Sequence, residues 1–308
     1  MNSEKGHFIA IVLSFIAIYI IWGSTYLFVA YAIEEVPPLK MAAMRFLIAG
    51  GIMMIAVPLL GKWQVISKEE IRNAVIGGFL FLTLGNGAMC YALQYIDSGM
   101  AALLISAQPL LLLFMMRIID GTPIPAMALF GCALGIIGMH LLVSQDQLTA
   151  GPDQWKGLLA LLSCLFTWGY ASLFVQRRKM PKSIFVNSSI QMLVGSVSLF
   201  IISAAVGEET VDWFGLKPMS WYSIMYLVVF GSVMAFTAFN YLLRYVSAEK
   251  VSTSTYVNPI VAMALGWYFR DELISTKSII AAIILLLGVY FINAYKPKKT
   301  KAIEPTSD

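Results

Sequence analysis

Apolar residues along this chain gather into long continuous runs, and short segments with charges, Pro and Gly separate one run from the next. Several runs reach about 18 to 23 residues, the length that a helix rising about 1.5 Å per residue needs to cross the hydrocarbon of a bilayer. The runs are uniformly apolar, whereas the strands of a membrane barrel alternate apolar and polar positions. The pattern therefore predicts an all-α membrane protein.

Ten runs are predicted as transmembrane helices, joined by connections too short to hold a soluble domain. In the first half they cover residues 8–31, 38–60, 74–95, 98–118 and 124–143. In the second half they cover residues 157–175, 184–206, 221–245, 248–269 and 276–295. We expect residues 8–143 and 157–295 to form two repeats, followed by a basic tail at residues 296–308.

Composition agrees with lipid as the main solvent, because 59% of the 308 residues are hydrophobic and only 12% are charged. The three cysteines, Cys90, Cys132 and Cys164, lie inside apolar runs without the spacing of a metal cluster or a disulfide framework. We interpret them as packing residues and expect neither a metal nor a cofactor.

Lys and Arg concentrate in every second connection, which sets the predicted orientation because basic loops stay on the cytoplasmic side. The largest groups lie at residues 177–182 and 296–301, whereas the other connections carry acidic residues such as Glu34, Glu35 and Glu208. Both termini are therefore predicted to be cytoplasmic. The net charge of +4 is then a signal of topology, so nucleic acid is not an expected partner.

The two halves of the chain resemble each other. Tyr91, Leu93, Tyr95, Gln108 and Pro109 in the first half correspond at a spacing of 150 residues to a matching set with Asn in place of Gln: Tyr241, Leu243, Tyr245, Asn258 and Pro259. The dipeptide Trp22-Gly23 recurs as Trp168-Gly169 at a spacing of 146 residues. Because each half has an odd number of predicted spans, the second copy enters the membrane from the opposite side. The sequence thus predicts two inverted five-helix repeats, the architecture of many secondary transporters.

These features together resemble the EamA-domain family of the drug/metabolite transporter superfamily. The motifs that carry the resemblance are Trp22-Gly23-Ser24, Arg45-Phe46, Tyr91-Ala92-Leu93, residues 101–109, residues 251–259 and Asp271-Glu272. Their order and duplication cover nearly the whole chain. One departure is Thr122, which stands where the second repeat has Glu272, so a mechanism that needs two symmetric carboxylates is in doubt.

The resemblance implies export of amino acids or related metabolites across the bacterial inner membrane. It also implies a central cavity lined by the first four helices of each repeat, with the fifth and tenth helices at the periphery. The expected partners are a small-molecule solute and the lipid bilayer, and the oligomeric state stays open between monomer and homodimer.

Arg45 is an ionisable residue well inside a predicted span, where a cation usually faces a cavity or a partner. A guanidinium there matches the two oxygens of a carboxylate. A structural role, with the guanidinium bound to helix carbonyls or reaching the interface, is an equal alternative.

Pro109 and Pro259 lie near the middle of their predicted spans, where a proline frees a carbonyl and permits a bend. Their matched positions favour hinges, although kinks that serve packing alone are common. The remaining candidates for substrate binding are aromatic and polar residues inside spans: Trp22, Thr25, Tyr26, Asn86, Tyr91, Gln108, Trp168, Gln191, Asn240, Tyr241, Thr255 and Asn258.

Other classes of protein fit less well. Only two histidines are present, and no nucleophile elbow or phosphate-binding loop is visible, so an enzyme is not expected. A facilitative channel-like permease, or an importer of another solute such as a nucleoside or sugar derivative, stays open. Asp271 and Glu272 are as consistent with a solvated loop as with proton transfer, and no carboxylate is recognised inside a span, so proton coupling has little support.

Overall fold

The computed structural model describes residues 2–59, 61, 64–95, 101, 104–143, 153–270 and 276–294, and all regular structure within these ranges is helical. The predicted basic tail at residues 296–308, the acidic pair Asp271-Glu272 and most of the start of the fourth span lie outside the described residues.

The first repeat contains α1 (Asn2–Ile16), η1 (Ala17–Ile21) and α2 (Trp22–Ile33) in its first span and α3 (Pro38–Leu59) in its second. Its remaining spans contain α4 (Lys68–Gly78), η2 (Phe79–Gly87) and α5 (Ala88–Ala92), then α7 (Gln108–Asp120), then α8 (Ala126–Val143).

The second repeat begins with α9 (Gln154–Arg177) and α10 (Ile184–Ala205). Its eighth span contains α11 (Pro218–Tyr226), η3 (Leu227–Phe236) and α12 (Thr237–Tyr245). The ninth contains α13 (Ala248–Val251) and α14 (Ser254–Arg270), and the tenth is α15 (Thr276–Ala294).

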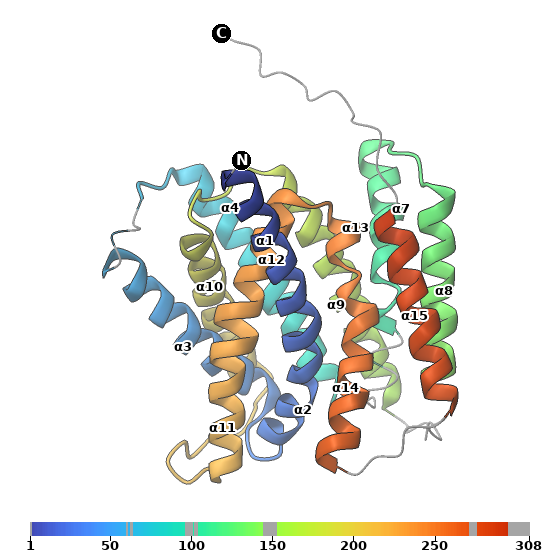
Figure 1. Cartoon of the computed structure of the whole chain (residues 1–308). Helices are drawn as coiled ribbons and strands as arrows, with labels where there is room; N and C mark the ends of the chain where they lie inside the picture. The colour runs from blue at the N-terminus through green and yellow to red at the C-terminus, as the bar shows by residue number, and fades with distance from the viewer. Residues whose placement is uncertain are drawn as a thin grey trace.

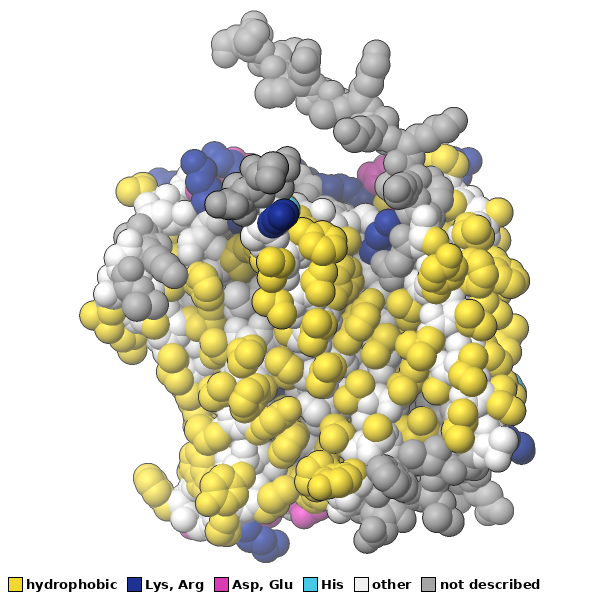
Figure 2. Space-filling view, viewed as in Figure 1, with side chains coloured by type: hydrophobic (Ala, Val, Ile, Leu, Met, Phe, Trp, Pro, Cys, Tyr) yellow, Lys and Arg dark blue, Asp and Glu magenta, His cyan; other side chains and the backbone are white. Residues whose placement is uncertain are grey.

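The helices form one bundle whose outer surface suits lipid. Six helices of the described chain are long and apolar enough to cross a membrane, and two shorter apolar helices accompany them. Hydrophobic side chains cover the middle of the face seen in Figure 2, while Lys, Arg, Asp and Glu gather at its two ends. The all-α membrane fold is confirmed.

The third span begins at Lys68, earlier than the predicted start at residue 74. Ser67 caps this helix: its Oγ accepts a hydrogen bond from the Glu70 N–H at 3.3 Å, and Glu70 Oε2 accepts one from the Ser67 N–H at 2.8 Å. This reciprocal pair extends the helix through a charged first turn that the apolar run does not include.

The two repeats have opposite directions in the bundle. The N-terminal end of α1 and the C-terminal end of α15 lie on the same side of the molecule, and α3 packs against α10 while running the opposite way (Figure 1). The bounds of α3 and α10 differ by 146 residues at both ends, the spacing of the Trp-Gly repeat. The inverted repeat predicted from the sequence is therefore the architecture of the chain.

α8 and α15 form a separate pair at one edge of the bundle (Figure 1). They approach closely at glycines: a Cβ on Gly131 would lie 2.8 Å from the Gly288 carbonyl oxygen, and a Cβ on Gly288 would lie 2.8 Å from the Gly131 carbonyl oxygen. Close backbone approach of this kind is how membrane helices gain packing without a hydrophobic driving force. The pair leaves the other eight spans to surround the centre.

Acidic side chains on the side opposite the chain ends bind across the repeats. Glu208 accepts hydrogen bonds from the backbone N–H groups of Leu39 and Lys40 at 2.9 Å each, where α3 begins. Glu35 accepts a hydrogen bond from Ser220 Oγ at 2.5 Å, and this bond is the main cause that lowers the pKa of the Glu35 carboxyl. The ionised form of Glu35 therefore supports this link, which weakens as the pH falls through that lowered pKa.

Candidate functional site

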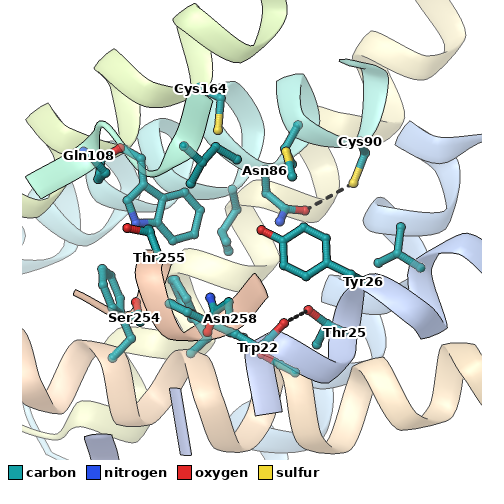
Figure 3. Close-up of a pocket in the computed structure, with 18 of the residues that line it drawn as sticks. Trp22, Thr25, Tyr26, Asn86, Cys90, Gln108, Cys164, Ser254, Thr255 and Asn258 are labelled. Atoms are coloured by element: carbon teal, nitrogen blue, oxygen red, sulfur yellow. Dashed lines mark hydrogen bonds between the residues drawn. The ribbon is translucent and has the colours of Figure 1, made fainter. Parts of the chain in front are cut away.

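A cavity of about 160 Å³ lies between the repeats, and both repeats contribute its walls. Figure 3 shows Tyr26 and Asn86 beside each other, with Gln108 and Thr255 on the opposite side. The volume holds on the order of ten water molecules. The space therefore suits a small organic solute.

Nine of the thirteen predicted binding residues line this cavity: Trp22, Thr25, Tyr26, Arg45, Asn86, Gln108, Trp168, Thr255 and Asn258. They come from the first to fourth, sixth and ninth spans, and the eighth span adds Gly231, Phe236 and Phe239. The seventh span, α10, contributes no lining residue among those described, which differs from the expectation that it lines the cavity.

Arg45 is the charged residue of the described cavity wall, and only 6% of it is exposed. Its Nε donates a hydrogen bond to Ser232 Oγ at 2.6 Å, which joins the second span to the eighth. No described ion pair engages the guanidinium, and a Cβ on Gly231 would lie 2.8 Å from Nη2. The guanidinium is thus anchored through one nitrogen beside a glycine that leaves space for its outer nitrogens.

Aromatic rings form the middle of the cavity wall. The rings of Trp22 and Trp168 meet edge to face with centroids 5.9 Å apart, and Phe239 lies 5.1 Å from Trp22 and 5.7 Å from Trp168. Because Trp22 and Trp168 are equivalent residues of the two repeats, their contact places both on the internal symmetry axis. A flat or apolar solute body would find its complement here.

The amides before the two prolines each bind the opposite repeat. Assigned from its hydrogen-bond partners, the Gln108 amide donates to the Leu165 carbonyl at 3.1 Å and accepts from the Gly169 N–H at 3.2 Å. Asn258, assigned in the same way, donates to the carbonyls of Ile18 and Tyr19 at 3.1 Å each. Each amide therefore joins its own repeat to the Trp-Gly segment of the other.

The segments that receive these amides differ. Residues 17–21 form the π-helix η1, whereas the equivalent part of α9 is regular α-helix. Two further π-helices, η2 and η3, occupy nearly equivalent positions in the third and eighth spans. All three lie beside cavity-lining residues, and π-helical turns are frequent at functional sites.

The predicted hinge prolines have different positions in their helices. Pro109 is the second residue of α7, just after a break at residues 106–107, whereas Pro259 lies inside α14. The continuous fourth span that we predicted is therefore interrupted. Proline fits the first turn of a helix because it has no N–H to leave unpaired there. A hinge role for either proline stays a prediction.

Gln191 and Asn240 lie away from the cavity in a buried polar cluster. Asn240 Nδ2 donates to Gln191 Oε1 at 2.8 Å and to Ser188 Oγ at 3.1 Å, and its Oδ1 accepts from Asn187 Nδ2 at 3.2 Å. Gln191 also packs against Gly77 and Gly78 of the third span. These side chains join α10 to α12, which explains why α10 adds nothing to the cavity wall.

Tyr91 and Tyr241 also lie outside the cavity wall, near the ends of the third and eighth spans. The Tyr91 hydroxyl accepts a hydrogen bond from Tyr95 at 3.1 Å, and the Tyr241 hydroxyl lies 3.0 Å from His7 Nδ1. Inverted symmetry sends the two tyrosine pairs to opposite sides of the membrane. Their positions are typical of interfacial aromatic residues.

Cys90, Cys164, Phe236 and Phe239 line the cavity without having been predicted to do so. Their side chains carry no sequence signal that separates a cavity wall from a helix contact or a lipid face. Glu249 corrects a second expectation, because it is a carboxylate in the ninth predicted span and only 5% of it is exposed. Among the described residues no group of three or more His, Cys, Asp or Glu could hold a metal ion.

Sequence comparison places these features in a known family. The EamA-like transporter family matches residues 8–144 and again residues 155–294, which together make up most of the chain. The chain belongs to the EamA-like transporter family. This transporter is therefore a secondary transporter built from two EamA units, as its cavity between inverted repeats also indicates.

Relatives of this EamA-family transporter extend over nearly its whole length. The uncharacterized inner membrane transporter YedA of Escherichia coli is 33% identical over 300 residues, covering 94% of this chain and 95% of YedA. The uncharacterized transporter YoaV of Bacillus subtilis is 21% identical, covering 95% and 99%. Protein PagO of Salmonella typhimurium is 22% identical, covering 92% of each chain.

A solved crystal structure shares the fold of this transporter with a TM-score of 0.76. The two chains are 17% identical, and the match covers 92% of this chain and 96% of the other. At this identity the likeness concerns the fold alone.

Proposed function

We propose that this transporter exports amino acids or related small carboxylates across the bacterial inner membrane by alternating access. The observation that carries the proposal is Arg45, a buried cation in the cavity wall that no described carboxylate neutralises. A charge held in a low-dielectric site without a counter-ion favours an anionic ligand. A carboxylate matches the geometry of a guanidinium.

The remaining wall supports a solute with a polar end and an apolar body. Neutral groups such as Asn86, Gln108 and Asn258 offer hydrogen bonds, whereas Trp22 and Trp168 offer flat apolar surface. No Asp or Glu belongs to the described wall, so a substrate ammonium group would be met by neutral oxygens and ring faces.

Alternating access is supported by the contacts between repeats. Gln108 and Asn258 form corresponding bonds to opposite repeats, yet their receiving segments differ in helix type. In an inverted repeat, the inward-open and outward-open conformations differ in which repeat adopts which local structure. Equivalent contacts that differ between the repeats are consistent with such an exchange. A channel-like permease or an importer of another solute is the alternative, and the direction of export rests on the family resemblance.

The inner membrane and the sidedness of the termini are part of the same proposal. YedA is named as an inner membrane transporter. The basic connections of this chain support cytoplasmic positions for both ends. We propose residues 8–143 and 157–295 as the repeats, in a monomer or homodimer.

Reconstituted protein in liposomes tests the role of Arg45. We expect Arg45→Ala to abolish transport of carboxylates such as radiolabelled phenylalanine and alanine, because the paired charge-assisted bonds are lost. Arg45→Lys should retain part of the activity, since lysine keeps the positive charge but lacks the planar guanidinium that binds both carboxylate oxygens. Arg72→Ala, which removes an exposed arginine of α4, serves as the matched control.

Folding of each variant is checked by its elution profile in detergent and its thermal melting midpoint. Transport of carboxylates by well-folded Arg45→Ala at the wild-type rate would refute the anion-binding role. Transport of uncharged nucleosides or sugars in preference to carboxylates would favour the alternative.

A further inference from the structure

Glu249 is a buried carboxyl group at the start of the ninth span. It belongs to α13, on the side of the bundle where α1 begins and α15 ends (Figure 1), and 5% of the residue is exposed. The carboxyl of a glutamate at a helix end usually finds water or a partner. Here the surroundings are the packed helices α7, α9, α12 and α15.

The Glu249 carboxyl has an unsatisfied oxygen. Oε2 is inaccessible and has no hydrogen-bond partner in the structure, and none of the ion pairs of the described chain includes Glu249. A buried carboxylate oxygen without a hydrogen-bond partner disfavours the ionised form of the group. A bound proton removes that charge and supplies an O–H.

The arginines of the helices packed against α13 have other partners than Glu249. On α7, Arg117 donates to the Gly121 carbonyl at 2.8 Å, and Asp120 pairs with Arg177 of α9. On α12, Arg244 donates to backbone carbonyls of residues 181 and 182. The other ionisable groups of the packed elements are Lys156, Cys164, Tyr170, Tyr241, Tyr245, Lys277 and Tyr290, beside Lys250 of α13 itself, which has its own interaction.

The position of Glu249 connects it to the cavity. Ala248 before it and Ser252 one turn after it both line the cavity wall, and Ser252 Oγ donates to the Glu249 carbonyl at 2.7 Å. A rigid movement of α13 that opens the cavity on this side would expose the Glu249 side chain to the same water. Burial and exposure of the carboxyl would then follow opening and closing.

We propose that Glu249 is a proton-binding site whose proton accompanies the conformational cycle of the transporter. The carboxyl takes up one proton before α13 closes over it and releases that proton to water when this side opens. Burial of Oε2 without a partner disfavours closure over the ionised carboxyl, so proton uptake favours closure. Coupling of that proton to solute movement rests on the proposed function, whereas proton binding itself does not.

The first experiment measures pH-gradient dependence in liposomes. We expect an imposed pH gradient to stimulate carboxylate transport by the wild type and by Glu69→Gln, which removes an exposed glutamate of α4. Glu249→Gln should lose that stimulation while still exchanging labelled for unlabelled solute, because the amide mimics the protonated acid permanently. Exchange also shows that the variant is folded.

The second experiment needs no transported solute. A hydrophobic carbodiimide adds the O–H of a protonated carboxyl in apolar surroundings across its C=N bond, and the adduct rearranges to a stable acylurea. We expect dicyclohexylcarbodiimide to modify Glu249 of the purified wild type, detected by peptide mass spectrometry, with less modification as the pH rises. Glu69 should stay unmodified.

Absence of modification at Glu249 at any pH would overturn the proton site, whatever the substrate proves to be. Modification of Glu249 together with equal gradient stimulation in Glu249→Gln and the wild type would overturn the coupling. If the wild type does not transport carboxylates at all, that result contradicts the proposed function and leaves the proton site untouched.

Discussion

At the scale of single residues, the site depends on how Arg45 is held. Ser232 fixes Nε, and the missing side chain of Gly231 leaves room for Nη2. Trp22 donates from its indole Nε1 to the Gly231 carbonyl at 3.3 Å, so one residue of η3 positions both the charge and part of the aromatic wall. The site therefore depends on a residue of the cavity wall that has no side chain of its own.

Gly231→Ala tests this dependence. Its Cβ would lie 2.8 Å from Arg45 Nη2, and the flexible guanidinium would move away instead of the backbone. Loss of one charge-assisted hydrogen bond, about 1.5–3 kcal/mol, corresponds to an increase of about 10- to 150-fold in the half-saturation concentration for carboxylates. The melting midpoint in detergent should change little. An unchanged half-saturation concentration would show that Nη2 does not contact the solute.

At the scale of helices, tight contacts join the ninth span to the pair of helices at the edge of the bundle. Gly131 and Gly288 bring α8 and α15 together, and Tyr256 of α14 is fully buried over Gly135 of α8. The ninth span is thus seated on the peripheral pair at Tyr256 while its other face borders the cavity through Thr255 and Asn258.

Gly135→Ala should weaken the packing of Tyr256 against α8. A Cβ at this position would overlap the ring of Tyr256, which has no exposed surface into which it could move. Overpacking of this kind costs about 1–3 kcal/mol. We expect a melting midpoint in detergent several degrees below that of the wild type.

Gly51→Ala is the matched control, because nothing lies within 4 Å of a Cβ built on this helical glycine of α3. Alanine in a helix is favoured over glycine by about 0.5–1 kcal/mol, so Gly51→Ala should melt at or slightly above the wild-type temperature. Equal melting of the two variants would mean that Tyr256 adapts to the added group.

At the scale of the whole molecule, the two repeats share a plan but have different chemistry. Arg45 of α3 corresponds to Gln191 of α10 at the spacing of 146 residues. The arginine faces the central cavity, whereas the glutamine binds Asn240 in a buried cluster. One repeat therefore supplies the charge and the other supplies packing, so the solute site is asymmetric within a symmetric frame.

The inverted arrangement of the two repeats predicts the side of the membrane on which the two ends of the chain lie. Both ends should be accessible from the cytoplasm, because the N-terminal end of α1 and the C-terminal end of α15 lie on one side of the bundle (Figure 1) and the basic connections predict that this side is cytoplasmic. Single cysteines at Ser3 and Ser307, in a variant in which Cys90, Cys132 and Cys164 are serine, should react with a membrane-impermeant maleimide only in inverted vesicles. Labelling of one end in each vesicle orientation would exclude two repeats of opposite direction.

Much of the fold could be predicted from the sequence alone. Runs of apolar residues specify spans because lipid cannot satisfy an exposed backbone, and the duplicated Trp-Gly and amide-Pro motifs specify the repeat. The span at 184–205 begins at the predicted residue, since polar segments border the run. The start at Lys68 and the break at residues 106–107 depend on a cap and on a local proline effect that hydropathy does not register.

The chemistry of the centre followed the sequence only in part. The length and hydropathy of each segment determine how many times the chain crosses the membrane, because each span is in contact with lipid. The duplication determines that the two repeats run in opposite directions. Whether a polar side chain inside a span meets solute or another helix is decided by the rotation and neighbours of that span. Only the tertiary structure therefore separated Arg45 and Asn86 in the cavity wall from Gln191 and Asn240 in a packing cluster, and showed that Oε2 of Glu249 is buried without a hydrogen-bond partner.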